Sequence, residues 1–195
     1  MFEGVIPAIV TPFLRNSTRD VDIEGLRSNI EFLLAHGVHG IVPCGSTGES
    51  ATLTFEEHEK VIEVAIDVAD GKVPVIAGTG SNNTAEAIRL TKAARDMGAD
   101  GALVISPYYN KPNRSGLVKH YTALADIGIP VIMYNVPGRT GQNLAPDLVA
   151  ELARHPDIVE IKEASGDIGQ ISRIIEATLD EDFQVISGDD NITLP

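Results

Sequence analysis

The stretch Ile158-Val159-Glu160-Ile161 decides the fold, because its hydrophobic residues are nearly continuous instead of alternating with polar ones. Near-continuous apolar character is typical of a strand whose two faces are both covered, as in a parallel sheet. Other stretches along the chain have the same character. The seven predicted strands cover residues 5–10, 40–42, 73–77, 102–105, 130–133, 158–161 and 184–186.

Helical patterns fill the gaps between these strands. Apolar residues recur on one helical face after Asp22, and the chain then reaches Gly37, which is typical of a helix end. Thr54 with Glu57 predicts a capping box, and Asn83 with Glu86 repeats the pattern. Three further helices are predicted around residue 120, from residue 146 and after Asp167, which has Gln170 three residues further on and so repeats the capping spacing. Strands and helices therefore alternate strictly.

Repeated strand and helix units of about 30 residues are typical of two architectures. Doubly wound sheets usually carry five or six strands, whereas seven regular repeats favour a (β/α)8 TIM barrel. A barrel normally takes about 250 residues, and this chain has 195. We therefore expect residues 1–195 to form a single (β/α) barrel domain that is truncated after the seventh strand, with the eighth strand and the C-terminal helices absent.

Charge and composition exclude several classes of function. The chain holds 15 Lys and Arg against 28 Asp and Glu, a formal charge of −13, which repels nucleic acid and anionic membranes. Cys44 is the only cysteine, which fits a reducing compartment. The start of the chain lacks a signal peptide, and no apolar run approaches the roughly 20 residues of a membrane span. These features predict a cytoplasmic protein without a nucleic-acid or membrane partner.

Lys162 is the most informative residue in the chain. In a parallel barrel the reacting groups lie beyond the carboxyl ends of the strands, and Lys162 directly ends a predicted strand. Burial disfavours an ammonium and lowers its pKa, which leaves a free amine that can attack a ketone and form a Schiff base. On position alone, the simpler interpretation is an ordinary lysine paired with a carboxylate such as Glu163.

Other strand ends add hydroxyls and one cation. The turn at residues 45–48 offers two hydroxyls and backbone N–H groups that suit a carboxylate. Tyr109 and Tyr134 carry phenols that can relay protons, and Arg139 can take a carboxylate by two hydrogen bonds. Each of these features alone has an ordinary structural interpretation: a Gly/Ser loop, packed aromatic rings and a surface ion pair.

Cofactor and metal motifs are weak in this sequence. A dinucleotide fingerprint beginning at Gly78 lacks its third glycine, because Asn83 stands there. His36 and His39 have the spacing of metal ligands but precede a strand, so structural roles are favoured. Asp189 and Asp190 have the chemistry to bind a cation, but a role in a loop or a helix cap is favoured.

Five motifs taken together resemble one known family. They occur in register along the whole chain, and they resemble the 4-hydroxy-tetrahydrodipicolinate synthases, also called dihydrodipicolinate synthases. The motifs are Gly45-Ser46-Thr47-Gly48-Glu49-Ser50, Pro107-Tyr108-Tyr109-Asn110, Tyr134-Asn135-Val136-Pro137-Gly138-Arg139-Thr140, Ile161-Lys162-Glu163-Ala164 and Ser187-Gly188-Asp189-Asp190. The resemblance implies a class I aldolase-type barrel that condenses pyruvate with L-aspartate 4-semialdehyde, the first committed step of diaminopimelate and lysine biosynthesis, without a metal or organic cofactor.

The resemblance also implies residue roles. Lys162 would form the imine with pyruvate, and Tyr134, Ser46 and Tyr109 would relay protons, with Ser46 keeping the hydroxyl of the threonine that is frequent in the family. The tyrosine matched by Tyr109 reaches a neighbouring subunit's site, which implies a homo-oligomer, a dimer or tetramer. Substrates would be bound by Thr47, Arg139 and Gly188, and the lysine effector of inhibited members by Ser50, His58, Asn82, Glu86 and Tyr108.

Two alternatives stay open at this point. N-acetylneuraminate lyase and the 2-keto-3-deoxy sugar-acid aldolases are similar around the lysine and the tyrosine, but usually lack the arginine matched by Arg139. An incomplete, non-catalytic family member with a binding or structural role is the second alternative, and the chain length favours it. In addition, Glu160 stands on the same strand face as Lys162 where a small residue is expected, and a carboxylate buried there needs a partner.

Overall fold

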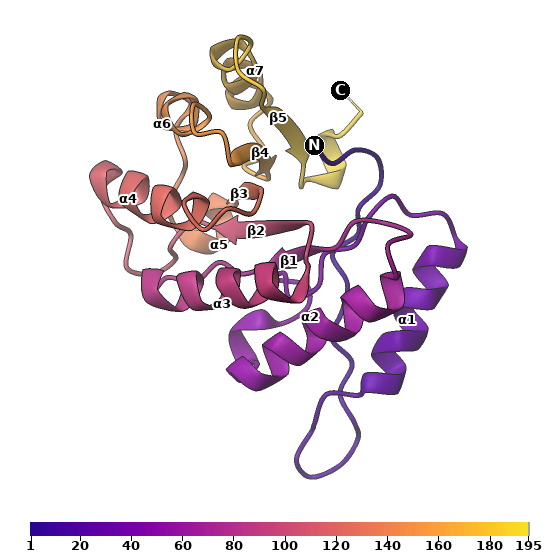
Figure 1. Ribbon diagram of the computed structural model, residues 1–195. Coiled ribbons are helices and arrows are strands. Elements are labelled where there is room, and N and C mark those ends of the chain that lie inside the picture. The colour runs from indigo at the N-terminus through magenta and orange to yellow at the C-terminus, as the bar shows by residue number, and fades with distance from the viewer. Residues whose placement is uncertain (195) are drawn as a thin grey trace. The chain divides into compact units, whose positions relative to one another are not determined.

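The structure, a computed structural model, describes residues 1–194 and shows helices alternating with strands (Figure 1). Five strands follow one another in the sheet in sequence order, β1-β2-β3-β4-β5. The pairs β3 with β4 and β4 with β5 are parallel. An α/β fold with a parallel sheet is thereby confirmed. The chain divides into two compact units, and a single barrel domain over residues 1–195 stays a prediction.

The first unit comprises residues 2–79 and 90–102, and the second comprises Met1 and residues 80–89 and 103–195. The elements of the first unit are α1 (Ile23–Ala35), η1 (Ser50–Thr52), α2 (Phe55–Ala69) and β1 (Ile76–Gly78); α3 (Thr84–Met97) and β2 (Gly101–Ile105) have residues in both units. The elements of the second unit are α4 (Arg114–Ala125), β3 (Val131–Asn135), α5 (Pro137–Thr140), α6 (Pro146–Leu152), β4 (Ile158–Glu163), α7 (Ile168–Ala177), β5 (Gln184–Ser187) and η2 (Asp190–Ile192).

The first unit is held by helices α1 and α2, which pack side by side (Figure 1). Leu26 and Ile30 of α1 meet the apolar face of α2 in one buried core. The predicted start signals are confirmed in both helices. Asp22 accepts a hydrogen bond from Gly25 N at 2.9 Å, and Thr54 forms the full capping box at the start of α2.

The first two predicted strands, residues 5–10 and 40–42, do not form continuous ladders. The parallel contacts here are isolated bridges, Ala8 with Val42 and Ile41 with Val75. Prolines are the physical reason, because Pro7, Pro43 and Pro74 stand where a longer ladder needs an N–H donor. The prediction of an extended strand at residues 5–10 and at residues 40–42 was therefore wrong, although these segments do pair with their expected neighbours through single bridges.

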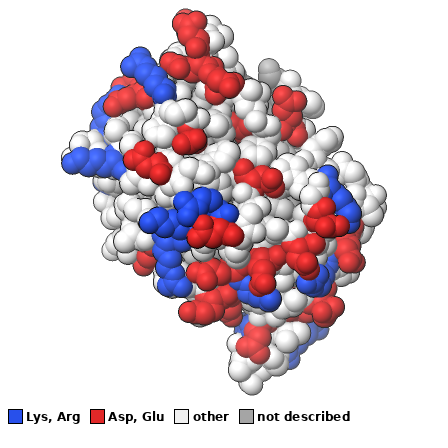
Figure 2. Space-filling view, viewed as in Figure 1, with Lys and Arg blue, Asp and Glu red and all other residues white. Residues whose placement is uncertain are grey.

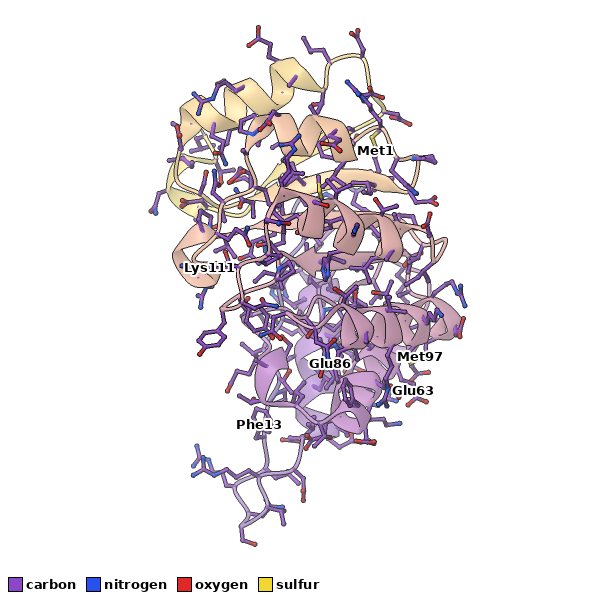
Figure 3. All side chains as sticks on the ribbon, turned by 90° about the vertical axis from the view of Figure 1, so that its left-hand side faces the viewer. Met1, Phe13, Glu63, Glu86, Met97 and Lys111 are labelled. Atoms are coloured by element: carbon purple, nitrogen blue, oxygen red, sulfur yellow. The ribbon has the colours of Figure 1, made fainter. Side chains whose placement is uncertain are left out.

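A long loop joins Phe13 to Val21, and Figure 3 shows it extending away from the helices of the first unit. Its ends are joined by an antiparallel bridge between those two residues and by a hydrogen bond from Leu14 N to Asp20 O at 2.8 Å. Within the loop, Asp20 accepts hydrogen bonds from Asn16 and Thr18. These bonds account for the order of an exposed segment without an apolar core.

The second unit has its own core, which includes Ile132, Met133, Ile158 and Ile161, all fully buried on the central strands. The parallel register of β3 and β4 is the feature that positions the functional residues. Tyr134 pairs with Lys162, and the next pair along the strands is Asn135 with Glu163. Because side chains alternate across a strand, these two pairs lie on opposite faces of the sheet.

Two predicted capping boxes form only in part. Asp167 accepts a hydrogen bond from Gln170 N at 3.0 Å, but the Gln170 side chain bonds elsewhere. Asn83 accepts one from Ala85 N, and the Glu86 carboxylate instead accepts from the Ser81 hydroxyl at 2.9 Å. Tertiary partners thus compete with the local capping pattern.

The smaller structural predictions agree with the contacts. Cys44 is buried, and burial raises the pKa of its thiol. His39 accepts a hydrogen bond from Val5 N, and His36 Nδ1 lies 2.7 Å from Phe32 O, so both rings have structural partners. Asp189 caps η2. In the face of the molecule shown in Figure 2, acidic side chains cover more area than basic ones, and no helix within residues 1–194 is long and apolar enough to cross a membrane.

Candidate active site

Lys162 and Tyr134 form the centre of the candidate site. They face each other across neighbouring strands β4 and β3, and Lys162 Nζ lies 4.8 Å from the centre of the Tyr134 ring. Tyr134 is buried and Lys162 is partly buried. At this distance the ring can stabilise an ammonium, and its hydroxyl is carried on the same face of the sheet as the amine.

The environment of this pair shifts both titrations. Burial lowers the pKa of Lys162, and the charge of Asp190 opposes this shift in part. Burial raises the pKa of Tyr134, and the charge of Arg139 opposes that shift. Lys162 therefore loses its proton more readily than an exposed lysine does, while the Tyr134 phenol keeps its proton. A nucleophile beside a proton donor is what carbonyl addition requires.

The simpler interpretation of Lys162 named Glu163 as one possible partner, and this particular ion pair does not form. Glu163 stands on the opposite face of β4, and no ion pair within residues 1–194 joins the two side chains. Its carboxylate instead accepts hydrogen bonds from Asn135 and Gln170. The Lys162 amine is thus not held by its neighbour in sequence.

Gly188 determines where the Lys162 side chain lies. It follows β5, and its N–H donates to Glu163 O at 2.8 Å. A Cβ added at Gly188 would stand 2.8 Å from Lys162 Cε, 2.9 Å from Lys162 Cγ and 3.2 Å from the Ala164 Cβ. The lysine stem therefore occupies the space that any side chain at position 188 would need.

Gly188→Ala should displace the Lys162 amine while leaving the fold intact, because the nearest crowded atoms belong to a flexible side chain. With Lys162 as the nucleophile that the resemblance implies, we expect pyruvate capture, measured by borohydride trapping over time, to slow by roughly tenfold or more. The urea midpoint should change little. Gly138→Ala adds the same methyl group where no atom lies within 4 Å, so it should trap at the normal rate. Normal trapping by Gly188→Ala would remove this role.

Arg139 lies on α5, a four-residue helix that the sequence pattern did not predict. Pro137 begins the helix and Gly141, with φ +70°, ends it. The Arg139 side chain is exposed and close enough to Tyr134 to affect its pKa. An exposed guanidinium beside the reacting pair suits the carboxylate of a second substrate.

Tyr109 lies in the loop after β2 and does not pack within the chain. It is 90% exposed and has a φ of +72°, an uncommon conformation for a residue with a large side chain. The loop is held by a hydrogen bond from Asn110 to Asn82 O, and another joins Gln142 to Pro112 O. An ordered backbone thus presents a large aromatic ring to the outside.

Ser46 and Thr47 belong to the first unit, whereas Lys162 belongs to the second, so their joint role with Lys162 stays a prediction. Both side chains are exposed on a compact turn. The turn is closed by a hydrogen bond from Gly48 N to Gly45 O at 3.0 Å. The Thr11 hydroxyl supports it by donating to Gly48 O at 2.7 Å.

The predicted effector residues are likewise divided between the units. Ser50 and His58 belong to the first, and the other three belong to the second. His58 is buried, its Nε2 lies 2.7 Å from Gly78 O, and burial lowers its pKa. Tyr108 is partly exposed. An effector role for the set, which also includes Asn82 and Glu86, stays a prediction.

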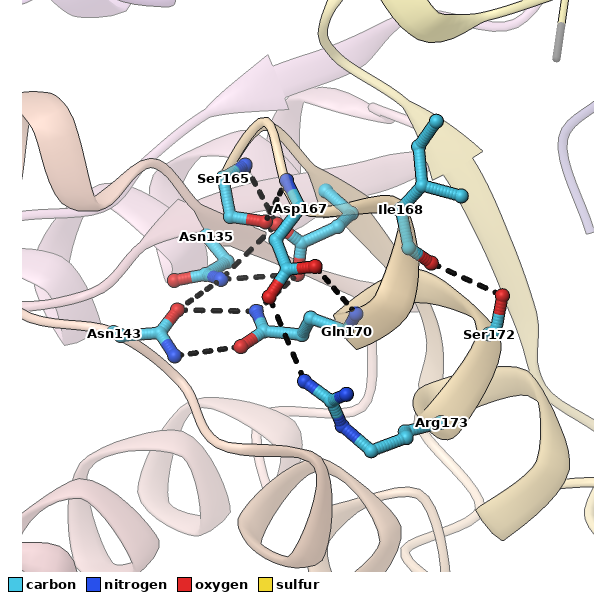
Figure 4. Close-up of polar contacts among 9 residues, drawn as sticks. Asn135, Asn143, Ser165, Asp167, Ile168, Gln170, Ser172 and Arg173 are labelled. Atoms are coloured by element: carbon cyan, nitrogen blue, oxygen red, sulfur yellow. Dashed lines mark hydrogen bonds and ion pairs between the residues drawn. The ribbon is translucent and has the colours of Figure 1, made fainter.

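Sequence reasoning missed a buried polar network behind the Lys162 strand (Figure 4). Its centre is Glu163, which is 1% exposed. The amides of Asn135 and Gln170 donate hydrogen bonds to its carboxylate, and the amide of Asn143 bonds to both of them. Alternation along β4 places Glu163 on the covered face, and this was the signal in the sequence that could have indicated its burial.

Glu160 is also fully buried on β4, as expected for its position. Within residues 1–194 no group of three or more metal-ligating side chains is present.

Comparison with known proteins decides the family. The whole chain, residues 1–195, matches the model of the Dihydrodipicolinate synthetase family. The chain belongs to this family. Among relatives of the family, the 4-hydroxy-tetrahydrodipicolinate synthase of Methanoculleus marisnigri is 76% identical over 195 residues, and that of Methanospirillum hungatei is 73% identical. Each match covers all of this chain and 67% of the relative.

Solved structures of the family have the same fold. Dihydrodipicolinate synthase from Aquifex aeolicus is 49% identical with a TM-score of 0.95, and the match covers all of this chain and 66% of that one. The Acinetobacter baumannii enzyme, solved with pyruvate, is 48% identical with a TM-score of 0.95, and the match covers 99% and 66%. The chain thus spans about two thirds of the length of these relatives and matches a family of enzymes.

Proposed function

We propose that this chain forms a Schiff base between Lys162 and pyruvate and condenses it with L-aspartate 4-semialdehyde. The observation that carries the proposal is the pairing of Lys162 with Tyr134 on one face of the sheet, with the amine 4.8 Å from the ring centre. A lysine amine whose pKa burial lowers is the nucleophile that this chemistry needs. A bound pyruvate in the Acinetobacter baumannii relative supports the same substrate.

The reaction follows from the chemistry of an imine. The Lys162 amine adds to C2 of pyruvate, and the carbonyl oxygen leaves as water once Tyr134 supplies a proton. The iminium withdraws electrons from the methyl carbon, which loses a proton and becomes an enamine. This carbon attacks the aldehyde and forms the new carbon–carbon bond, and the aldehyde oxygen takes a proton. Water or the amino group of the semialdehyde then adds to the imine carbon and releases the Lys162 amine. Neither a metal ion nor an organic cofactor takes part in the proposed steps.

Three further groups have proposed parts in this reaction. Ser46 and Tyr109 relay the proton to and from Tyr134, and Thr47 binds the pyruvate carboxylate. Support for an oligomer comes from Tyr109, whose ring is 90% exposed on an ordered loop and is thus free to reach another subunit. We propose a homo-oligomer in which this tyrosine completes a neighbouring site.

Arg139→Ala should leave pyruvate capture intact but raise KM for the semialdehyde. A hydrogen-bonded charge pair contributes roughly 1.5–3 kcal/mol, so we expect KM to rise by about 10- to 100-fold. Steady-state kinetics with each substrate varied in turn will measure this. An unchanged KM for the semialdehyde would assign its carboxylate to another residue and reopen the sugar-acid aldolase alternative. Lys119→Ala is the control, because it removes a positive charge at an exposed position of α4.

A further inference from the structure

We propose that Glu163 is a positioning residue for Lys162: its buried amide network fixes the ends of β3 and β4 and thereby holds the amine beside Tyr134. This inference rests on the proposed role of Lys162 as the nucleophile. Glu163 touches neither the amine nor any substrate, because it stands on the opposite face of the strand. Its effect must therefore pass through the backbone.

The contacts of Glu163 are unusual for a buried carboxylate because its hydrogen-bond donors are neutral amide and main-chain N–H groups. Asn135 Nδ2 donates to both oxygens, at 3.1 and 2.9 Å. Ser165 N donates to Oε1 at 2.7 Å, and Gln170 Nε2 donates to Oε2 at 3.1 Å. A buried charge costs several kcal/mol unless its oxygens are fully bonded. Converging N–H groups supply that bonding here and restrict the carboxylate to one position.

A second layer of amides holds the first. Asn143 Oδ1 accepts from Asn135 at 2.8 Å, while Asn143 and Gln170 exchange two hydrogen bonds, at 2.7 and 3.1 Å. Asn135 Oδ1 in turn accepts from Leu144 N at 3.0 Å. Figure 4 shows these amides meeting between the strand ends and α7. The network is therefore a connected set, and loss of one member leaves buried groups unpaired.

The position of the network in sequence gives it influence over the reacting groups. Glu163 directly follows Lys162, and Asn135 directly follows Tyr134. Main-chain bonds complete the connection, because Ala164 N donates to Asn135 O at 2.9 Å and Gly188 N donates to Glu163 O at 2.8 Å. One network thus fixes the backbone on which the amine and the phenol are carried.

Positioning of this kind affects rate more than binding. A lysine has a long flexible stem, so its amine is placed only as well as its Cα and its neighbours are placed. A shift of about 1 Å in a reacting group can slow a reaction by about a hundredfold. A purely stabilising network would change the unfolding free energy and leave the chemistry of the folded protein unaltered.

Glu163→Gln tests the proposal, because it keeps the shape but turns one acceptor oxygen into a donor that faces other donors. We expect deuterium exchange of the pyruvate methyl group, at saturating pyruvate, to slow by about 10- to 100-fold. Without pyruvate, competitive acetylation of Lys162 across pH should shift towards the profile of an exposed lysine. The double variant with Gln170→Glu returns a carboxylate to the network and should recover part of both properties.

Thr91→Val is the matched control for lost stability. It removes a buried hydrogen bond, from Thr91 Oγ1 to Thr79 Oγ1 at 2.8 Å, in the first unit. This variant should lower the urea midpoint but leave the exchange rate and the Lys162 acetylation profile unchanged. If Glu163→Gln does not fold, Asn143→Ala removes an exposed member of the second layer and should show a smaller change in the same direction.

The possible results separate this proposal from the proposed function. If Glu163→Gln has the wild-type rate of deuterium exchange and the wild-type acetylation profile of Lys162, the positioning role is overturned and the Schiff base is left intact. If Thr91→Val slows deuterium exchange equally, the positioning role is also overturned, because a general loss of stability would then explain the slower exchange. Absence of exchange from the wild-type chain would contradict the proposed function, and the acetylation profiles would still decide whether Glu163 positions Lys162.

Discussion

Lys162→Ala should abolish deuterium exchange of the pyruvate methyl group. This exchange requires an iminium that acidifies the methyl protons, and only an amine in covalent contact with C2 can form it. The alanine side chain is too short to attack and carries no nitrogen. Because Lys162 is only partly buried, we expect the folded state to survive. Proton NMR of pyruvate in D2O measures the loss directly.

Lys119→Ala provides the comparison for this experiment. Lys119 is exposed on α4, so its removal changes the net charge by the same amount without changing the candidate site. It should exchange pyruvate protons at the wild-type rate. Exchange that persists in Lys162→Ala would show that another amine, or the solvent alone, activates pyruvate, and the Schiff base on Lys162 would have to be abandoned.

Tyr134→Phe should slow the same exchange by about a hundredfold to ten-thousandfold, the usual contribution of a positioned acid or base. The phenol is buried beside Lys162, and burial raises its pKa, so it holds a proton that can be given to the departing oxygen. Phenylalanine keeps the ring that packs against the lysine stem and removes only the hydroxyl. The measured rate therefore reports proton transfer and not packing.

The contrast between two tyrosines makes this prediction specific. Tyr121 is also fully buried, and its hydroxyl lies 3.4 Å from Val104 O, but it belongs to the core of the second unit. Tyr121→Phe should lower stability slightly and leave the exchange rate unchanged. Equal rates for Tyr134→Phe and the wild-type chain would show that water or another group supplies the proton.

The central strands could be predicted because their side chains repeat a simple rule. Residues 130–133 are apolar and residues 158–161 are apolar except for Glu160, so a buried parallel strand was the expected result in each case and is the observed one. The first strands failed because ladder formation depends on individual N–H groups. Pro7, Pro43 and Pro74 remove those donors without altering the hydrophobic pattern.

The candidate site also contains residues that the sequence predicts and residues that it does not. Lys162 was predictable, since its position at a strand end is visible in the sequence. The role of Glu163 was not predictable, because its side-chain partners come from β3 and α7 and are themselves bonded to Asn143 in the segment after α5. Gln170 resembled a local cap, but its side chain bonds to Glu163 instead. A polar network of this kind is determined by tertiary packing, which the spacing of residues in one segment does not encode.

Peptide mapping after borohydride reduction in the presence of pyruvate tests the central claim most directly. We predict that the digested wild-type chain carries a single reduced pyruvyl adduct and that fragmentation places it on Lys162, with labelling lost when pyruvate is omitted. The amount of adduct should rise with pH and reach half its maximum below the ordinary lysine pKa, because burial lowers the pKa of this amine. An adduct spread over exposed lysines, or confined to another lysine, would contradict the account.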